Sequence, residues 1–189
     1  MIEYEKKIML TADEYAALLL MSDPSASVIS QTNYYFDTED HSMGRMGITC
    51  RIRARNGRFK ATIKTHGSAS RDSSTEDVLE EKSTFDPTVF RPLHVHCQGA
   101  LVTERAVLYK DKFCEAVLDR NTYLGFTDYE LEIEYLSGNE DKAFGLLYRI
   151  ANVLKASSAN TDPAEFLSRT GMPKSERFFA RIRERQGGD

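Results

Sequence analysis

The chain has 189 residues, of which 41% are hydrophobic and 29% charged, and its formal net charge is −4. These values fit a single globular domain over residues 1–189 and give no sign of a nucleic-acid or membrane partner. Three widely spaced cysteines argue against a disulfide framework, and no apolar run approaches the ~18 residues of a membrane span. We therefore expect a cytoplasmic protein.

The first predicted element is a strand over residues 2–10, with sequence IEYEKKIML. Side chains alternate between the two faces of a strand, so Glu3, Glu5 and Lys7 share one face. Two like charges side by side repel each other, which is unusual for an ordinary solvated strand. This charged face needs an explanation from the rest of the chain.

Eight segments in all carry the alternation of a strand. They span residues 2–10, 28–40, 48–55, 58–65, 78–85, 101–110, 112–119 and 128–136. The Asn56-Gly57 dipeptide between the third and fourth segments predicts a tight hairpin, and a second hairpin is expected around Asp111. The Ser-rich stretch at 65–77 is predicted to be a loop.

Helices are predicted between and after these strands. Thr11 and Glu14 form the pattern of a capping box, which predicts a helix from residue 12. Apolar residues at helical spacing predict further helices over 139–156 and 162–171, and a short helix is expected within 86–100. The tail from residue 175 could begin as a strand or a helix. The pattern as a whole indicates an α+β fold whose strand count would allow a barrel.

Charge of one sign covers whole strand faces. Two neighbouring strands carry basic faces, at Arg51, Arg53, Arg55, Lys60 and Lys64. The last strand carries an acidic face, at Glu130, Glu132 and Glu134. A half-exposed sheet also alternates, but its polar face usually mixes signs because neighbouring like charges cost energy. Basic strands suit phosphate groups and acidic strands suit divalent metals, so we predict a metal–polyphosphate site lining a sheet or barrel.

The order of the charged motifs resembles the CYTH superfamily, the triphosphate tunnel metalloenzymes. The ExExK signature at Glu3 to Lys7 is followed in the family's order by YFDT (35–38), RIR (51–53), TIK (62–64), TER (103–105), LD (118–119) and ELEIE (130–134). The resemblance covers nearly the whole chain and is greatest to the short, single-domain bacterial branch. It implies an eight-stranded antiparallel β-barrel that forms a tunnel, with helices packed outside and the charged faces pointing inward.

The resemblance also implies roles for individual residues. The metal ligands would be Glu3, Glu5, Asp119, Glu132 and Glu134, with Glu130 an open alternative in the last strand. The substrate-binding residues would be Arg51, Arg53, Lys60, Lys64, Glu80, Arg105 and Lys174. Glu80 is open to question because the adjacent Glu81 points the opposite way, and either Lys174 or Arg177 would close one tunnel mouth. Lys7, Arg53 and Glu132 would act in catalysis.

The implied activity is hydrolysis of a small-molecule triphosphate with Mg²⁺ or Mn²⁺. Inorganic tripolyphosphate is favoured over thiamine or nucleoside triphosphates, although the motif reads only the phosphates that they share. A class IV adenylate cyclase, which makes cyclic AMP from ATP, shares the fold and the ExExK signature and is one alternative. A non-catalytic polyphosphate-binding module is the other. A homodimer is possible for such a barrel.

Overall fold

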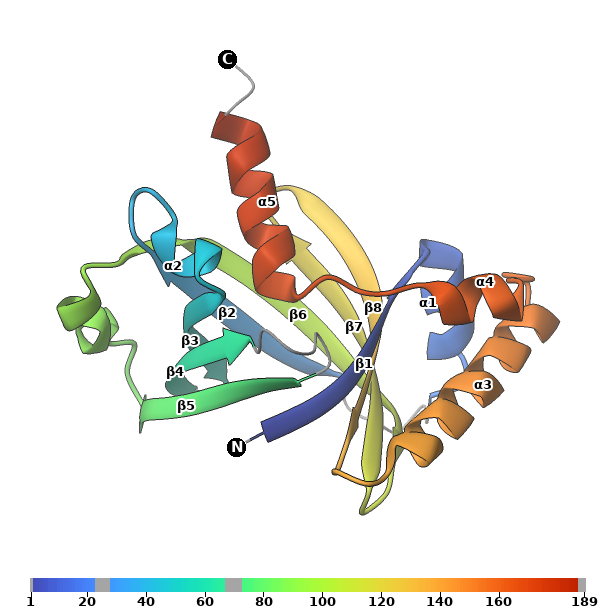
Figure 1. The fold of residues 1–189 in the computed structure, drawn as a ribbon. Coiled ribbons are helices and arrows are strands. Elements are labelled where there is room, and N and C mark those ends of the chain that lie inside the picture. Colours follow the sequence, from blue (N-terminus) through green and yellow to red (C-terminus); the bar gives the residue numbers. More distant parts are fainter. Residues whose placement is uncertain (1, 23–27, 67–72, 187–189) are drawn as a thin grey trace.

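The computed structural model describes residues 2–22, 28–66 and 73–186, and these form one β-barrel with helices around it (Figure 1). The strands are β1 (Ile2–Leu10), β2 (Ile29–Asp37), β3 (Ile48–Arg55), β4 (Arg58–His66), β5 (Ser73–Lys82), β6 (His96–Lys110), β7 (Cys114–Tyr123) and β8 (Phe126–Tyr135). The helices are α1 (Ala12–Leu19), α2 (Ser42–Arg45), the 3₁₀ helix η1 (Pro87–Leu93), α3 (Glu140–Ala156), α4 (Pro163–Ser168) and α5 (Lys174–Gln186).

The barrel is closed, with the strand order β1-β5-β4-β3-β2-β6-β7-β8 and antiparallel pairing throughout. Strand β1 completes it by pairing with β8 over seven positions and with β5 over three, from Ile2 to Tyr4. The predicted eight-stranded antiparallel barrel is therefore confirmed. None of the helices in the described ranges combines the length and apolar character that a membrane crossing requires.

Two tight hairpins set the register of the strands on either side of them. Asn56 and Gly57 both have positive φ, at 50° and 71°, as a type I′ turn requires, and this confirms the predicted β3–β4 hairpin. Leu124 and Gly125 do the same between β7 and β8, with φ of 48° and 75°. Because side chains have a period of two, a fixed turn also fixes which residues of each strand face the barrel interior.

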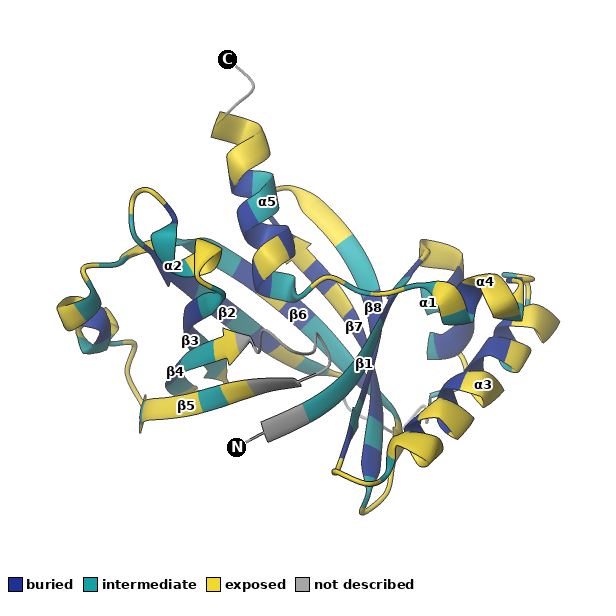
Figure 2. Ribbon diagram, viewed as in Figure 1, coloured by how far each residue is buried: buried dark blue, intermediate teal, exposed yellow. Residues whose placement is uncertain are grey.

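The largest apolar core lies outside the barrel, under α1, α3 and α4 (Figure 2). The buried stripe of α3, which includes Leu147, Ile150 and Leu154, packs there with the outward-facing side chains of β1, β6, β7 and β8. The capping box of α1 is present: the Thr11 hydroxyl accepts from Glu14 N at 3.2 Å, and Thr11 N donates to the Glu14 carboxylate at 2.8 Å. These helices brace one half of the barrel wall.

Helix α5 packs elsewhere, against the inner face of the barrel wall. Its Phe178, Phe179 and Ile182 form a cluster with Tyr35, Leu101 and Tyr123. Tyr35 pairs directly with Arg51, and both line the interior cavity described below, so this cluster belongs to the inner side of the sheet. The tail is thus a helix rather than a strand. Its first turn lies at the cavity.

The largest differences from the predicted boundaries lie in two segments. The predicted loop at 65–77 is partly strand, because β4 runs to His66 and β5 begins at Ser73, while residues 67–72 lie outside the described residues. The segment 86–100 contains the expected short helix as η1, but β6 begins within it at His96. In both places strand pairing extends the sheet into sequence with little local strand character.

Candidate functional site

The barrel encloses a cavity of about 260 Å³ that is lined mainly by charged side chains. Its eight basic residues are Lys7, Arg51, Arg53, Arg55, Lys60, Lys64, Arg105 and Lys174. Its five acidic residues are Glu5, Glu76, Glu115, Glu132 and Glu134. A chain with a net charge of −4 therefore gathers an excess of positive charge in one enclosed space. The alternation of each strand produces this, since the apolar partners of these residues point to the outer cores.

The β3–β4 hairpin forms the basic wall of this cavity. Arg53 pairs directly with Lys60, so two cations stand side by side on adjacent strands, and Lys64 lies on the same face opposite Thr49. Glu76 of β5 partly balances them, with an ion pair to Arg51 and a 3.4 Å contact to Lys60. Burial alone would raise the pKa of Glu76, but Arg51 and the other nearby cations lower it. The wall still carries more positive than negative charge.

Arg53 is a cation of the wall whose hydrogen-bond partner is neutral. Its Nε donates to Oδ1 of Asn33 at 3.0 Å, which is a neutral partner. Burial and the neighbouring Arg51 lower the pKa of Arg53 to about 10, even though Glu76 acts in the opposite direction. Asn33 is fully buried, and its Nδ2 has no hydrogen-bond partner within the described part of the chain. An anion at this point would relieve both groups.

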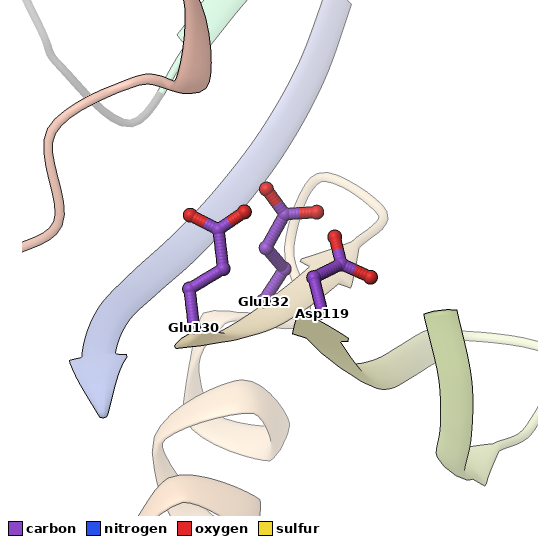
Figure 3. Close-up of side chains that lie close together, drawn as sticks. All are labelled: Asp119, Glu130 and Glu132. Carbon is purple, nitrogen blue, oxygen red and sulfur yellow. The ribbon is translucent and has the colours of Figure 1, made fainter. Parts of the chain in front are cut away.

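Opposite the basic wall lies a buried acidic cluster of Asp119, Glu130 and Glu132 (Figure 3). One carboxylate oxygen from each residue lies within 4.8 Å of the others. Asp119 pairs with Glu130 across β7 and β8, and Glu132 is two residues further along the same face of β8. Glu132 also lines the cavity. Three oxygen donors at this spacing fit the ligand preference of Mg²⁺ or Mn²⁺.

Several cations already contact this cluster. Arg105 donates to both oxygens of Asp119, at 2.8 and 2.6 Å, and Lys7 Nζ lies 2.9 Å from Glu132. Lys174 reaches all three carboxylates from the start of α5. Burial alone would raise the pKa of Glu132, but the ammonium of Lys174 and the other cations hold it well below its usual range. Lys174 and the other cations likewise lower the pKa of Glu130 against the effect of burial, so Glu130 and Glu132 are stabilised in the charged form that could bind a metal.

A second acidic group lies nearer the cavity mouth. Glu134 pairs directly with Glu5 of β1 on one side and with Glu115 of β7 on the other. Lys7 Nζ is 3.4 Å from Glu5, and Arg105 Nη1 is 3.6 Å from Glu134. The backbone of Glu3 pairs in β1, but its side chain lies outside the described part of the structure. Three carboxylates side by side on adjacent strands repel one another, and the contacts with Lys7 and Arg105 partly offset this cost.

The structure does not place Glu80 at the cavity. Thr62 pairs with Val78 and Ala61 with Glu80, so Leu79 is an extra residue that forms a β-bulge. The bulge turns Glu80 to the outer side with Ala61, where Lys82 Nζ lies 2.8 Å from it. Glu76, which pairs with Lys64, faces the cavity instead. The sequence prediction of Glu80 was wrong because the bulge reverses the alternation.

The structure brings together most of the other predicted residues. Lys7, Arg51, Arg53, Lys60, Lys64, Arg105, Lys174, Glu5, Glu132 and Glu134 all line the cavity. Of the three candidates in the last strand, Glu130 and Glu132 join Asp119, while Glu134 lies with the row at the mouth. Glu76 and Asn33 were missed. The alternation of Gln31, Asn33 and Tyr35 along β2 could have indicated Asn33, whereas Glu76 lies in a Ser-rich stretch without such a signal.

Comparison with known proteins gives a consistent result. The CYTH domain model matches residues 1–164. The YjbK protein of Bacillus subtilis (strain 168), a candidate triphosphatase by name, is 29% identical over 157 residues, which cover 75% of this chain and 81% of that protein. A crystal structure of a candidate adenylate cyclase from Bacillus halodurans is 24% identical and has a TM-score of 0.67, with 94% of this chain and 97% of that chain covered. The HpAC1 protein of Hippeastrum, described as a candidate adenylyl cyclase with dominant triphosphatase activity, is 22% identical with a TM-score of 0.60, covering 90% and 98%.

Proposed function

Because the chain belongs to the CYTH domain family, we propose that its barrel cavity binds a triphosphate and hydrolyses it with the help of a divalent metal. Inorganic tripolyphosphate is the favoured substrate. The observation that carries this proposal is the opposition of a basic wall and an acidic wall across one enclosed cavity. The name of the Bacillus subtilis relative as a candidate triphosphatase supports it.

The basic wall would bind the phosphates. Arg51, Arg53, Lys60, Lys64 and Arg105 point into one space from β3, β4 and β6. Guanidinium groups form paired hydrogen bonds with phosphate oxygens, and lysines add point charges. In phosphoryl transfer these groups would neutralise the charge that shifts toward the leaving phosphate. Lys7 lies beside Glu132, at the boundary between the two walls, and would contact the phosphate nearest the carboxylates.

The acidic wall would hold Mg²⁺ or Mn²⁺. The ligands we propose are Glu3, Glu5, Asp119, Glu132 and Glu134, and the geometry adds Glu130. A bound divalent ion would neutralise phosphate oxygens and lower the pKa of a water molecule that attacks phosphorus. Glu132 lines the cavity and belongs to the buried cluster, so it would both hold the metal and orient the site.

The test is phosphate release from tripolyphosphate by the purified protein, with Mg²⁺, with Mn²⁺ and with EDTA. We expect metal-dependent release that falls at least 100-fold in Glu5→Gln, because that change removes a charged metal ligand. Glu104→Gln is the matched control, since Glu104 is 45% exposed and pairs with Arg120 on the outer side. It should retain full activity.

The product separates the alternatives. Cyclic AMP and pyrophosphate from ATP, without phosphate release, would identify a cyclase. Binding of tripolyphosphate without turnover under any metal condition would identify a polyphosphate-binding module. Hydrolysis of thiamine or nucleoside triphosphates but not of tripolyphosphate would keep the hydrolase and change the substrate.

A further inference from the structure

The ammonium of Lys174 lies inside the acidic cluster, where a metal ion would be expected. Its Nζ is 2.8 Å from Asp119 and 2.8 Å from Glu132, and it also forms an ion pair with Glu130. Asp119 and Glu130 are fully buried, whereas Lys174 lines the cavity. Lys174 thus separates the inner part of the cluster from the space proposed for the substrate.

Each carboxylate of the cluster already contacts at least two cationic side chains of the chain itself. Arg105 binds Asp119 through both carboxylate oxygens, and Arg177 Nη2 lies 2.8 Å from Glu130. With Lys7 and Lys174, four cationic side chains contact three carboxylates. Lys7, Arg105 and Arg177 also contact Glu5, Glu134 and Asp128, whereas the ion pairs of Lys174 are with the three carboxylates of the cluster. A metal that enters must take the place of one of these cations.

Lys174 is the cation best placed to leave. Arg105 is on strand β6, and Lys7 is on strand β1, whose main chain is also bonded to the segment before α5 through Gly171 N at 2.8 Å. Lys174 is the first residue of α5, and its long side chain can change rotamer while the buried Phe178 keeps the helix in place. A triphosphate in the adjoining cavity would offer the ammonium several anionic oxygens.

We propose that Lys174 occupies the acidic cluster in the substrate-free protein, competes there with divalent cations, and gives up this position when a triphosphate binds. Metal and triphosphate then bind with positive coupling, since each favours the state in which Lys174 has left the carboxylates. The release by triphosphate rests on the proposed function. The competition between Lys174 and the metal does not.

The experiment is a calorimetric titration with Mn²⁺ alone, so it does not depend on any catalytic activity. We expect weak binding to the wild-type protein and binding at least about 10-fold tighter to Lys174→Met, which keeps the length of the side chain and removes its charge. Lys174→Arg should bind Mn²⁺ as weakly as the wild type, because it keeps the competing cation. Lys155→Met, at an exposed lysine of α3, is the surface control and should change nothing.

The tighter Mn²⁺ binding of Lys174→Met must come from the acidic cluster. Adding Glu130→Gln to Lys174→Met should therefore abolish it. Wild-type protein that binds Mn²⁺ as tightly as Lys174→Met would overturn the inference, and so would a gain that survives Glu130→Gln. Tight Mn²⁺ binding by the wild-type protein alone would also overturn the inference, so the test does not depend on the folding of the methionine variant. If the tighter binding appears but no triphosphate is hydrolysed, the proposed function fails and the competition stands.

Discussion

Arg53 is a half-buried cation that would suit an anionic ligand under the proposed function. Its pKa is lowered to about 10 by burial and by Arg51, and the partner bonded to its Nε is the neutral amide of Asn33. The protein bears the cost of this charge in the free state, and a bound phosphate would offset it. Under the proposed function, Arg53 would therefore contribute to binding rather than to folding.

We therefore expect Arg53→Ala to reduce kcat/KM for the triphosphate about 10²–10³-fold, as the loss of one preorganised donor commonly does. Its melting temperature should stay within a few degrees of the wild type. Arg58→Ala is the control on the same hairpin, because Arg58 is exposed and pairs with Glu81. Unfolding of the Arg53 variant would mean that the residue is structural, and the proposed binding wall would then be wrong.

Glu14, in contrast, is a buried charge that stabilises the fold, because three groups of the chain donate hydrogen bonds to its carboxylate. Thr11 N, the Thr161 hydroxyl and Arg169 Nη1 all donate to its carboxylate, at distances between 2.7 and 2.9 Å. Burial alone would raise the pKa of Glu14, but these bonds lower it below the ordinary 4.5. Ionised Glu14 therefore stabilises the fold above pH 4.5, and this contribution is lost as the pH falls through the lowered pKa.

Glu14→Gln should reduce the free energy of unfolding by about 2–3 kcal/mol at pH 7, because it leaves Arg169 without its buried partner. The difference from the wild type should shrink as the pH falls below 4.5, as urea denaturation at several pH values would show. Glu165→Gln should have little effect, although Glu165 binds the same arginine, because its carboxylate is 66% exposed. A constant difference across the acid range would contradict the assignment.

At the scale of elements, the segment between α4 and α5 crosses closely over β1. Gly171 N donates to the main-chain oxygen of Lys7 at 2.8 Å. A Cβ on Gly171 would lie 3.2 Å from the main-chain carbonyl carbon of Lys7 and closer still to its side chain. This contact sets the position from which α5 begins, and Lys174 follows only three residues later. The close approach is possible because residue 171 is glycine.

Gly171→Ala should lower both activity and stability, with a loss of about 1–3 kcal/mol from overpacking. Gly145→Ala is the matched control, and its effect on stability should have the opposite sign. Gly145 lies in the exposed part of α3, where nothing is within 4 Å of the new methyl group. Alanine favours the helix there, so this variant should be more stable by up to about 1 kcal/mol. Thermal unfolding and phosphate release measured on both variants would decide. Equal behaviour of the two would show that the contact with Lys7 is unimportant.

The strands also show how much of the site could be predicted from the sequence. The alternation of apolar and charged residues along a strand is a local pattern, and it correctly predicted that Arg51, Arg53, Lys60 and Lys64 share one face. The Asn56-Gly57 turn fixed the register of the two strands that carry them. The bulge at Leu79 depends on how β4 and β5 pack, and no local signal revealed it. The place of Glu130, rather than Glu134, in the buried cluster depends likewise on the register of β8 against β7, which pairs Asp119 with Glu130 and Glu115 with Glu134. Tertiary packing decided each of these.

At the scale of the whole molecule, the barrel converts alternation along the chain into separation of charge in space. The basic strands β3 and β4 are neighbours in the barrel order, and the acidic strands β7, β8 and β1 are neighbours on the opposite side. Like charges that repel within each wall are a cost that the fold bears in the absence of ligand. Under the proposed function, the basic wall would attract an anion without a metal, because its cations line the cavity directly.

Tripolyphosphate should therefore stabilise the protein in EDTA. Ligand at 100 times its dissociation constant adds about 2.7 kcal/mol, which corresponds to roughly 5–10 °C for a chain of this size. The shift should fall steeply as salt rises, because the attraction is between charges, and it should be small in Arg53→Ala. Differential scanning fluorimetry with a salt series would measure it. A shift that appears only when Mg²⁺ or Mn²⁺ is present would mean that the basic wall cannot hold the triphosphate alone, and that the metal must bind first.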